Sequence, residues 1–116
     1  MPGDRLPLFC HVSDVAEAHV RALSHPQAGG KRFLLCGGAF NWALGASYIA
    51  EHYPQLRERL PKGWEKAEKK GQEAYARLDT TLAEEILEMK FKGWEEMLKD
   101  CIDDLLKLEQ KPEWDA

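Results

Sequence analysis

Two histidines and two carboxylates near the start of this sequence could carry out acid–base chemistry. His11 and His19 lie within a few residues of Asp14 and Glu17. An imidazole changes its charge near neutral pH, so a histidine paired with a carboxylate can take up and release a proton. We take His11 and Asp14 as the candidate catalytic pair. In the alternative interpretation each residue has a local structural role, in which Asp14 caps a helix, His19 is a half-buried helix residue and Glu17 is solvated.

Other catalytic and binding motifs are absent from the sequence. Cys10, His11 and Cys36 have neither Cys-x-x-Cys nor His-x-x-x-His spacing, so we predict no metal site. No Gly-x-Ser-x-Gly nucleophile motif occurs. Gly37-Gly38 is the only glycine pair after an expected strand, and it lacks the third glycine and the downstream acid of a dinucleotide-binding turn. We therefore predict no cofactor site in this sequence.

The candidate residues belong to a predicted strand–helix–strand unit over residues 9–42. The run FCHV predicts a short strand, and Asp14 can cap the helix that follows and ends before Pro26. Arg32–Cys36 is a continuous apolar run, typical of a strand covered on both faces. Because a helix joins the two runs, we expect the strands to be parallel. The fold class is α/β, mostly α, with two short parallel strands and four to five helices.

Residues 43–109 are predicted to be largely helical. Asn41 can cap a helix over Trp42–Tyr53, which is apolar around so much of its circumference that we expect a second surface to rest on it. Thr80 or Thr81 can cap a short helix. Trp94–Glu109 has the strongest helical periodicity. We expect an irregular lead-in over 1–8 and a frayed tail over 110–116, in a single domain over 1–116.

Composition excludes several functional classes. A chain of 116 residues is long enough for one core, and a net charge of −4 disfavours binding to nucleic acid. No apolar run is long enough to span a membrane. Three cysteines, all in apolar settings, fit a reducing compartment, so we expect a cytoplasmic protein.

Several ordered motifs resemble the carboxy-terminal part of the extended short-chain dehydrogenases/reductases, especially fungal aldehyde and methylglyoxal reductases and dihydroflavonol reductases. The motifs are FCHVSDVAEAHVRAL, GKRFLLCGGAF with a following Asn and Trp, Asp79-Thr80-Thr81, and Phe91-Lys92 leading into the last helix. The resemblance implies an NADPH-dependent redox step that uses a tyrosine with a lysine four residues later. No Tyr-x-x-x-Lys occurs in this sequence, and the nucleotide-binding half of the family is absent from it.

The resemblance also implies that this part of the family closes over the substrate. On that basis the candidate substrate-binding residues are Phe9, Cys36, Trp42 and Tyr48, with His11 beside them. The alternative is that Phe9, Cys36 and Trp42 are core residues. Without the rest of a reductase, strand edges and the apolar faces of the two long helices would lack cover, so we expect a homodimer with an interfacial pocket.

Three functions are consistent with these observations. The first is a stand-alone domain that binds a small apolar metabolite and could catalyse a cofactor-free cyclisation, isomerisation or dehydration in secondary metabolism. The second is a fragment of an NADPH-dependent aldehyde or ketone reductase whose activity resides in other residues. The third is a non-enzymatic protein that docks on a biosynthetic enzyme. We prefer the first function. The sequence leaves open whether the chain is an enzyme. If it is one, a non-redox lyase or isomerase is favoured over an oxidoreductase, because neither a glycine-rich cofactor loop nor a Tyr-x-x-x-Lys motif occurs.

Overall fold

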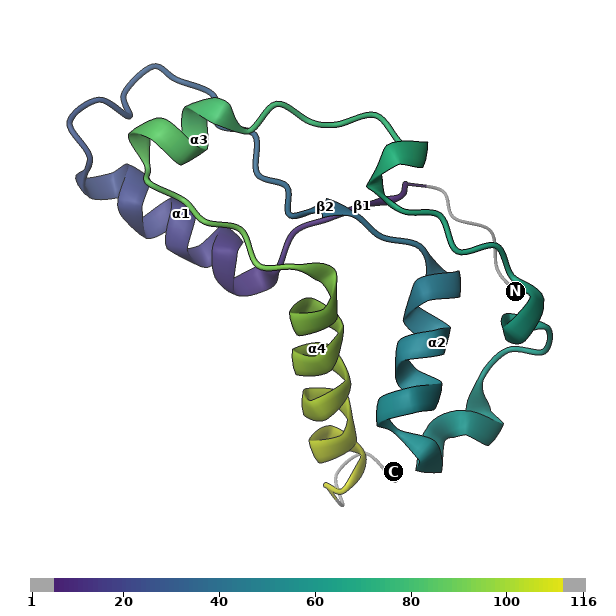
Figure 1. Cartoon of the computed structure of the whole chain (residues 1–116). Coiled ribbons are helices and arrows are strands. Elements are labelled where there is room, and N and C mark those ends of the chain that lie inside the picture. Colours follow the sequence, from purple (N-terminus) through teal and green to yellow (C-terminus); the bar gives the residue numbers. More distant parts are fainter. Residues whose placement is uncertain (1–5, 112–116) are drawn as a thin grey trace.

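The structure, a computed structural model, describes residues 6–111 and consists of helices around a very small β-ribbon (Figure 1). Parts of the predicted lead-in and tail, residues 1–5 and 112–116, lie outside the described residues. The strands are β1 (Leu8–Phe9) and β2 (Gly38–Ala39). The longer helices are α1 (Val12–Ser24), α2 (Trp42–His52) and α4 (Trp94–Glu109), and α3 (Thr81–Ile86) is short. Three 3₁₀ turns separate α2 from α3, at Pro54–Arg59, Trp64–Lys66 and Gln72–Ala74.

The two strands are antiparallel, so the predicted parallel pairing is wrong. Leu8 pairs with Ala39 and Phe9 with Gly38. A helix makes a parallel crossover only when it lies back over the sheet. Here α1 runs away from β1, and the chain returns beside α1, so β2 arrives in the opposite direction (Figure 1).

The run Arg32–Cys36 is not a strand, which also corrects the sequence prediction. Phe33 and Leu35 pack against the core formed by α1 and α3, whereas Leu34 between them is 43% exposed. The alternation shows an extended backbone whose apolar side is covered by helices instead of by a sheet. The apolar character of the run therefore reflects packing on α1 and α3.

Two apolar clusters lie on either side of the ribbon. The first joins α1 to α3 and the segment after it, through Ala18, Ala83, Leu87 and Met89. The second joins α2 to α4 through Ile49, Tyr53 and Leu98. In Figure 1 the ribbon of β1 and β2 lies between these two groups of helices. The cleft described below opens beside this ribbon.

The helix limits agree well with the local sequence signals. Asn41 caps α2, because the amide N–H of Leu44 donates to its Oδ1 at 3.0 Å. The predicted bounds of α4 are confirmed. The second surface expected on α2 is present within the chain: Pro54–Arg59 and Trp64–Lys66 pack on it, in addition to α4. The excess of apolar residues on α2 is thus explained by this chain itself.

The start of α1 differs from the prediction, because His11 and not Asp14 is its cap. The Ser13 amide N–H donates to His11 Nδ1 at 3.0 Å, and helix residues begin at Val12.

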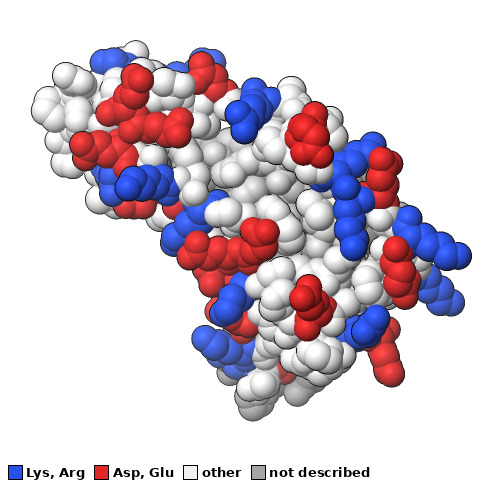
Figure 2. Space-filling model, viewed as in Figure 1, with Lys and Arg blue, Asp and Glu red and all other residues white. Residues whose placement is uncertain are grey.

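Among residues 6–111, no helix combines the length and the apolar character needed to cross a bilayer. On the face that Figure 2 shows, acidic and basic side chains are interspersed around a mostly uncharged centre.

Candidate functional site

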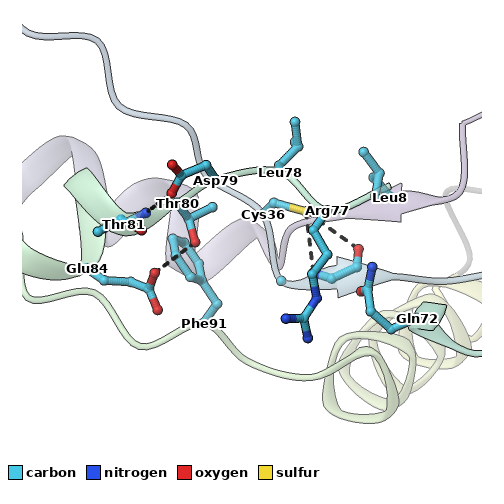
Figure 3. A pocket seen from close by; sticks show the side chains of 12 residues that line it. Leu8, Cys36, Gln72, Arg77, Leu78, Asp79, Thr80, Thr81, Glu84 and Phe91 are labelled. Carbon is cyan, nitrogen blue, oxygen red and sulfur yellow. Dashed lines mark hydrogen bonds between the residues drawn. The ribbon is translucent and has the colours of Figure 1, made fainter. Parts of the chain in front are cut away.

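An open cleft of about 500 Å³ lies beside the β-ribbon and is the main candidate site (Figure 3). One wall comes from β1 and from the segment that enters β2. The opposite wall comes from the third 3₁₀ turn, the segment before α3 and the first turns of α3. The lining residues are Leu8, Cys36, Gly37, Gly38, Gln72, Arg77, Leu78, Asp79, Thr80, Thr81, Glu84 and Phe91.

The glycine pair at the cleft wall is required by packing. A Cβ on Gly37 would lie 2.6 Å from the Phe9 ring and 2.8 Å from the carbonyl oxygen of Lys92. Gly38 has φ of +127°, a conformation that side chains disfavour. Gly37 therefore allows the segments of Phe9 and Lys92 to approach each other closely.

The cleft contains hydrogen-bonding groups of several kinds. Gln72 Oε1 accepts the amide N–H of Ala39 at 2.7 Å, which fixes the side chain against β2. Cys36 Sγ lies 3.4 Å from the amide nitrogen of Gly38. Arg77 lines the same cleft, and Figure 3 shows its side chain among the lining residues. A guanidinium and an amide in one cleft can bind the oxygen of a carbonyl or carboxylate group.

The far edge of the cleft is already hydrogen-bonded within itself. The Thr81 amide N–H donates to Asp79 Oδ1 at 3.0 Å, and the Thr80 hydroxyl donates to Glu84 Oε2 at 3.0 Å. The hydrogen bonds from Thr81 lower the pKa of Asp79 below its usual value. Asp79 is therefore a stable carboxylate at neutral pH and a poor proton donor.

The predicted substrate-binding residues are not brought together in this cleft. Cys36 lines it, whereas Phe9, Trp42 and Tyr48 belong to a row of aromatic side chains around Phe40 and Trp94. Ring centroids along this row are 5.2–6.5 Å apart, and Tyr48 also stacks on His52 at 4.0 Å. Trp42 is 48% exposed at one end of the row. Substrate contact by these residues stays a prediction.

The candidate catalytic residues His11 and Asp14 are both buried, but they do not pair with each other. His11 Nε2 lies 2.8 Å from Asp100 Oδ2 on α4. Asp14 Oδ2 accepts the amide N–H of Lys92 at 2.8 Å. His11 therefore pairs with a carboxylate, but its partner is Asp100, 89 residues away in the chain, and not Asp14.

The His11 ring is fixed from both sides. Its Nδ1 accepts the Ser13 amide N–H, so in this arrangement Nε2 carries the proton and donates it to Asp100. The Ser13 hydroxyl is 2.9 Å from the same Nδ1 and receives a hydrogen bond from Lys92 Nζ at 2.7 Å. Nδ1 is occupied by the helix cap and Nε2 by Asp100, so the geometry gives His11 a structural role. Its catalytic role stays a prediction.

No pattern in the sequence points to two of the cleft residues, Gln72 and Arg77. Both lie in the charge-rich stretch between α2 and α3, where neither periodicity nor a motif distinguishes them from solvated residues. Only the fold shows that this stretch reaches β2, where Gln72 accepts the amide N–H of Ala39. Within residues 6–111, no group of three or more His, Cys, Asp or Glu residues is arranged to hold a metal ion. Burial, then the nearby Asp14 and Cys36, raise the pKa of the Cys10 thiol, which therefore stays protonated at neutral pH.

Several known reductases are similar to this chain in sequence or in structure. A ketoreductase of Aspergillus fumigatus is 31% identical over 97 residues, which cover 84% of this chain and 27% of that protein. A putative NADPH-dependent methylglyoxal reductase of Candida albicans is 30% identical over 101 residues, with 81% and 28% covered. The crystal structure of a yeast methylglyoxal/isovaleraldehyde reductase complexed with NADPH matches 95% of this chain and 37% of its own, with a TM-score of 0.73 and 25% identity.

This chain corresponds to the carboxy-terminal part of an extended short-chain dehydrogenase/reductase. The family resemblance predicted from the motifs is thereby confirmed. No model of a protein family matches the sequence. The chain spans about 27–28% of the two curated reductases it was compared with above.

Proposed function

We propose that this chain forms the substrate-facing part of an NADPH-dependent carbonyl reductase, with the nicotinamide nucleotide held by residues outside this sequence. The observation that carries the proposal is the match of more than four fifths of the chain to reductases, combined with a cleft that has a guanidinium and an amide. A cofactor-free cyclase or isomerase finds no such support, because the relatives described above are all reductases.

Neither the glycine pair at the cleft nor the start of α2 fits the phosphates of a nicotinamide nucleotide. Dinucleotide phosphates bind where glycines leave backbone amides open at the start of a helix. Here the Gly37 amide N–H already donates to the Phe9 carbonyl oxygen at 2.8 Å, and the Gly38 amide lies 3.4 Å from Cys36 Sγ. At the start of α2 the Leu44 amide already donates to Asn41. The proposed role of this chain is therefore to bind and orient the carbonyl substrate.

Arg77 is the residue we expect to hold the substrate oxygen. Its side chain is exposed in the cleft, within the same wall as Gln72. A charge-assisted hydrogen bond contributes about 1.5–3 kcal/mol, and about 1.4 kcal/mol corresponds to a tenfold change in affinity. Loss of this bond should raise KM for a carbonyl substrate by roughly tenfold or more.

The test uses a hybrid reductase in which this chain replaces the matching segment of the Candida albicans methylglyoxal reductase. NADPH oxidation with methylglyoxal is measured for the hybrid and for its Arg77→Ala and Arg57→Ala variants. Arg57 is the control, because its guanidinium lies 5.6 Å from the centre of the Trp64 ring and does not line the cleft. We expect reduction by the hybrid, a raised KM for Arg77→Ala and an unchanged KM for Arg57→Ala.

A folded hybrid that binds NADPH but reduces no carbonyl compound would contradict the proposal. Equal KM values for the two arginine variants would leave the reductase role standing and remove Arg77 from substrate binding.

A second candidate function, binding of a small apolar molecule, is favoured by one further observation. An apolar groove of about 210 Å³ lies between α2, α4 and the first 3₁₀ turn, lined chiefly by Ile49, Leu56, Leu60, Ile102, Leu105 and Leu106. The ion pair between Arg59 and Glu109, at 2.8 Å, lies at the same groove. A thermal-shift screen with apolar metabolites, together with the solution mass by light scattering, tests both this candidate and the predicted homodimer. A monomer whose melting temperature no compound raises would contradict both.

A further inference from the structure

The β-ribbon contains one extra residue on the side of β2. Phe9 is paired with Gly38 in the ladder, yet the carbonyl oxygen of Phe9 accepts the amide N–H of Gly37 at 2.8 Å. Two residues on one strand that face a single residue on the other form a β-bulge, and Gly38, with φ of +127°, has the kind of backbone that a bulge places on glycine. Beyond the bulge the register moves by one residue, so Cys10 lies opposite Cys36.

The packing at Gly37 shows on which side of the ribbon the two thiols lie. A Cβ on Gly37 would meet the Phe9 ring at 2.6 Å, so positions 9 and 37 point to the same side. Successive side chains of an extended chain alternate between its two sides. The side chains of Cys10 and Cys36 therefore share the other side. Leu8 alternates with Phe9 in the same way, and it lines the cleft together with Cys36 (Figure 3).

Opposed residues of an antiparallel ribbon have the spacing that a disulfide needs. Phe9 and Gly37 share a hydrogen bond, so the next pair along the ribbon is one without, and the Cα atoms of such a pair lie about 4.5 Å apart. Disulfides join cysteines whose Cα atoms are about 4.4–6.8 Å apart. Both cysteines are free thiols, and the charge interaction with Cys36 that helps to raise the pKa of Cys10 agrees with their being neighbours.

We propose that Cys10 and Cys36 form a reversible disulfide when the protein meets a peroxide, which makes the pair a redox-sensitive modification site at the wall of the cleft. In reducing compartments, disulfides of this kind are transient and report on oxidants. The link would remove the Cys36 thiol from the cleft lining. An effect of the link on substrate binding rests on the proposed function, whereas the formation of the link does not.

The chemistry takes two steps. Cys36 meets the peroxide first, because it lines the open cleft, whereas Cys10 does not and burial raises the pKa of its thiol. The Cys36 sulfur attacks one peroxide oxygen, the O–O bond breaks, and a sulfenic acid and one water form. The Cys10 sulfur then attacks the sulfenic sulfur, and its thiol proton leaves with the departing hydroxyl as a second water. Two thiols have then lost two electrons in total, which reduce one peroxide to two waters, and a dithiol reverses the link by exchange.

The test treats the isolated chain with hydrogen peroxide and compares the wild type with Cys10→Ser, Cys36→Ser and Cys101→Ser. Cys101 is the matched control, because it is an exposed free thiol on α4, outside the ribbon. Trypsin cuts after Arg21 and Arg32, so Cys10 and Cys36 fall in separate peptides unless a disulfide joins them. Intact mass, linked peptides and thermal unfolding are measured before oxidation, after it, and after treatment with dithiothreitol.

We expect the wild type and Cys101→Ser each to lose two hydrogen atoms and to give one linked pair of peptides, which joins Cys10 to Cys36. Cys10→Ser and Cys36→Ser should not give this pair. The link closes a loop of about 25 residues in the unfolded chain and should raise the melting temperature by roughly 10 °C. Dithiothreitol should restore the original mass and melting temperature.

Three results would overturn the inference. The first is a Cys36 sulfinic acid beside an unmodified Cys10 thiol, and the second is a link from either residue to Cys101. The third is a Cys10–Cys36 link that lowers the melting temperature, because the fold would then have to distort to form it. None of these measurements uses NADPH or a carbonyl compound, so a failed link leaves the proposed function standing. A hybrid reductase that forms the link and yet reduces no carbonyl compound would contradict the proposed function alone.

Discussion

Replacing Gly37 by alanine should destabilise the protein at the junction of three segments. The added Cβ would lie 2.6 Å from the Phe9 ring and 2.8 Å from the carbonyl oxygen of Lys92, and real Cβ contacts essentially never fall below 3.0 Å. The Phe9 ring could rotate to make room. The Lys92 carbonyl cannot move alone, because its residue's amide N–H donates to the buried Asp14 carboxylate at 2.8 Å.

The expected cost follows from the size of this conflict. Adding one carbon to a packed site typically costs about 1–3 kcal/mol, because backbone or rotamers must shift. For a chain of this size a loss of 1 kcal/mol lowers the melting temperature by roughly 3–5 °C. We therefore expect Gly37→Ala to melt about 3–15 °C below the wild type.

The assay is urea and thermal unfolding followed by circular dichroism, with Gly29→Ala as the matched control. A Cβ at Gly29 meets no atom within 4 Å, and the backbone there is not left-handed. The control should therefore be neutral or slightly stabilising, because alanine restricts the unfolded chain. If Gly37→Ala were as stable as Gly29→Ala, the close packing of Phe9, Gly37 and Lys92 would be refuted.

Three further predictions concern hydrogen-bonded side chains. His11→Asn should keep a helix cap but lose the bond to Asp100, so NADPH oxidation by the hybrid should change by less than about threefold; a loss of a hundredfold would support catalysis by His11 instead. Tyr53→Phe should cost about 1–2 kcal/mol in urea unfolding, since the buried hydroxyl donates to Asp103 at 2.6 Å, and an unchanged unfolding midpoint would contradict that bond. Bonds from Lys99 and then Tyr53 lower the pKa of Asp103 below its usual 3.8, and Arg59 lowers that of Glu109 below its usual 4.5. Because these carboxylates bind protons more weakly in the folded state, they should stabilise the fold at neutral pH. This stabilisation should be lost as the pH falls through and below those values. A stability that rises as the pH falls, in unfolding measured across the acid range, would contradict this.

Local signals in the sequence are sufficient for the helices that end at strong caps and breakers. Asn41 and Pro54 limit α2, and a long amphipathic pattern sets α4, because these effects act between residues a few positions apart. The family resemblance is equally a property of the sequence, since it rests on ordered motifs along the chain. These features could be predicted without any knowledge of long-range contacts.

The direction of the strands and the structural role of the apolar runs could not be predicted from such local signals. Arg32–Cys36 has the composition of a buried strand, and the same composition also suits an extended segment packed on helices. Which of the two forms depends on whether a neighbouring strand or a helix covers it. That choice is made by the path of α1 and not by the run itself.

The candidate site shows the same division between sequence and fold. The helices, the glycine pair and the lack of the family's tyrosine–lysine redox pair all follow from the order of the residues along the chain. Folding of the whole chain brings His11 to Asp100, places Arg77, Gln72 and Cys36 in one cleft, and leaves Val12, Val20 and Leu23 of α1 exposed. The physical reason is that a side chain's chemistry is set by its nearest neighbours in space, and in this chain those neighbours lie tens of residues away.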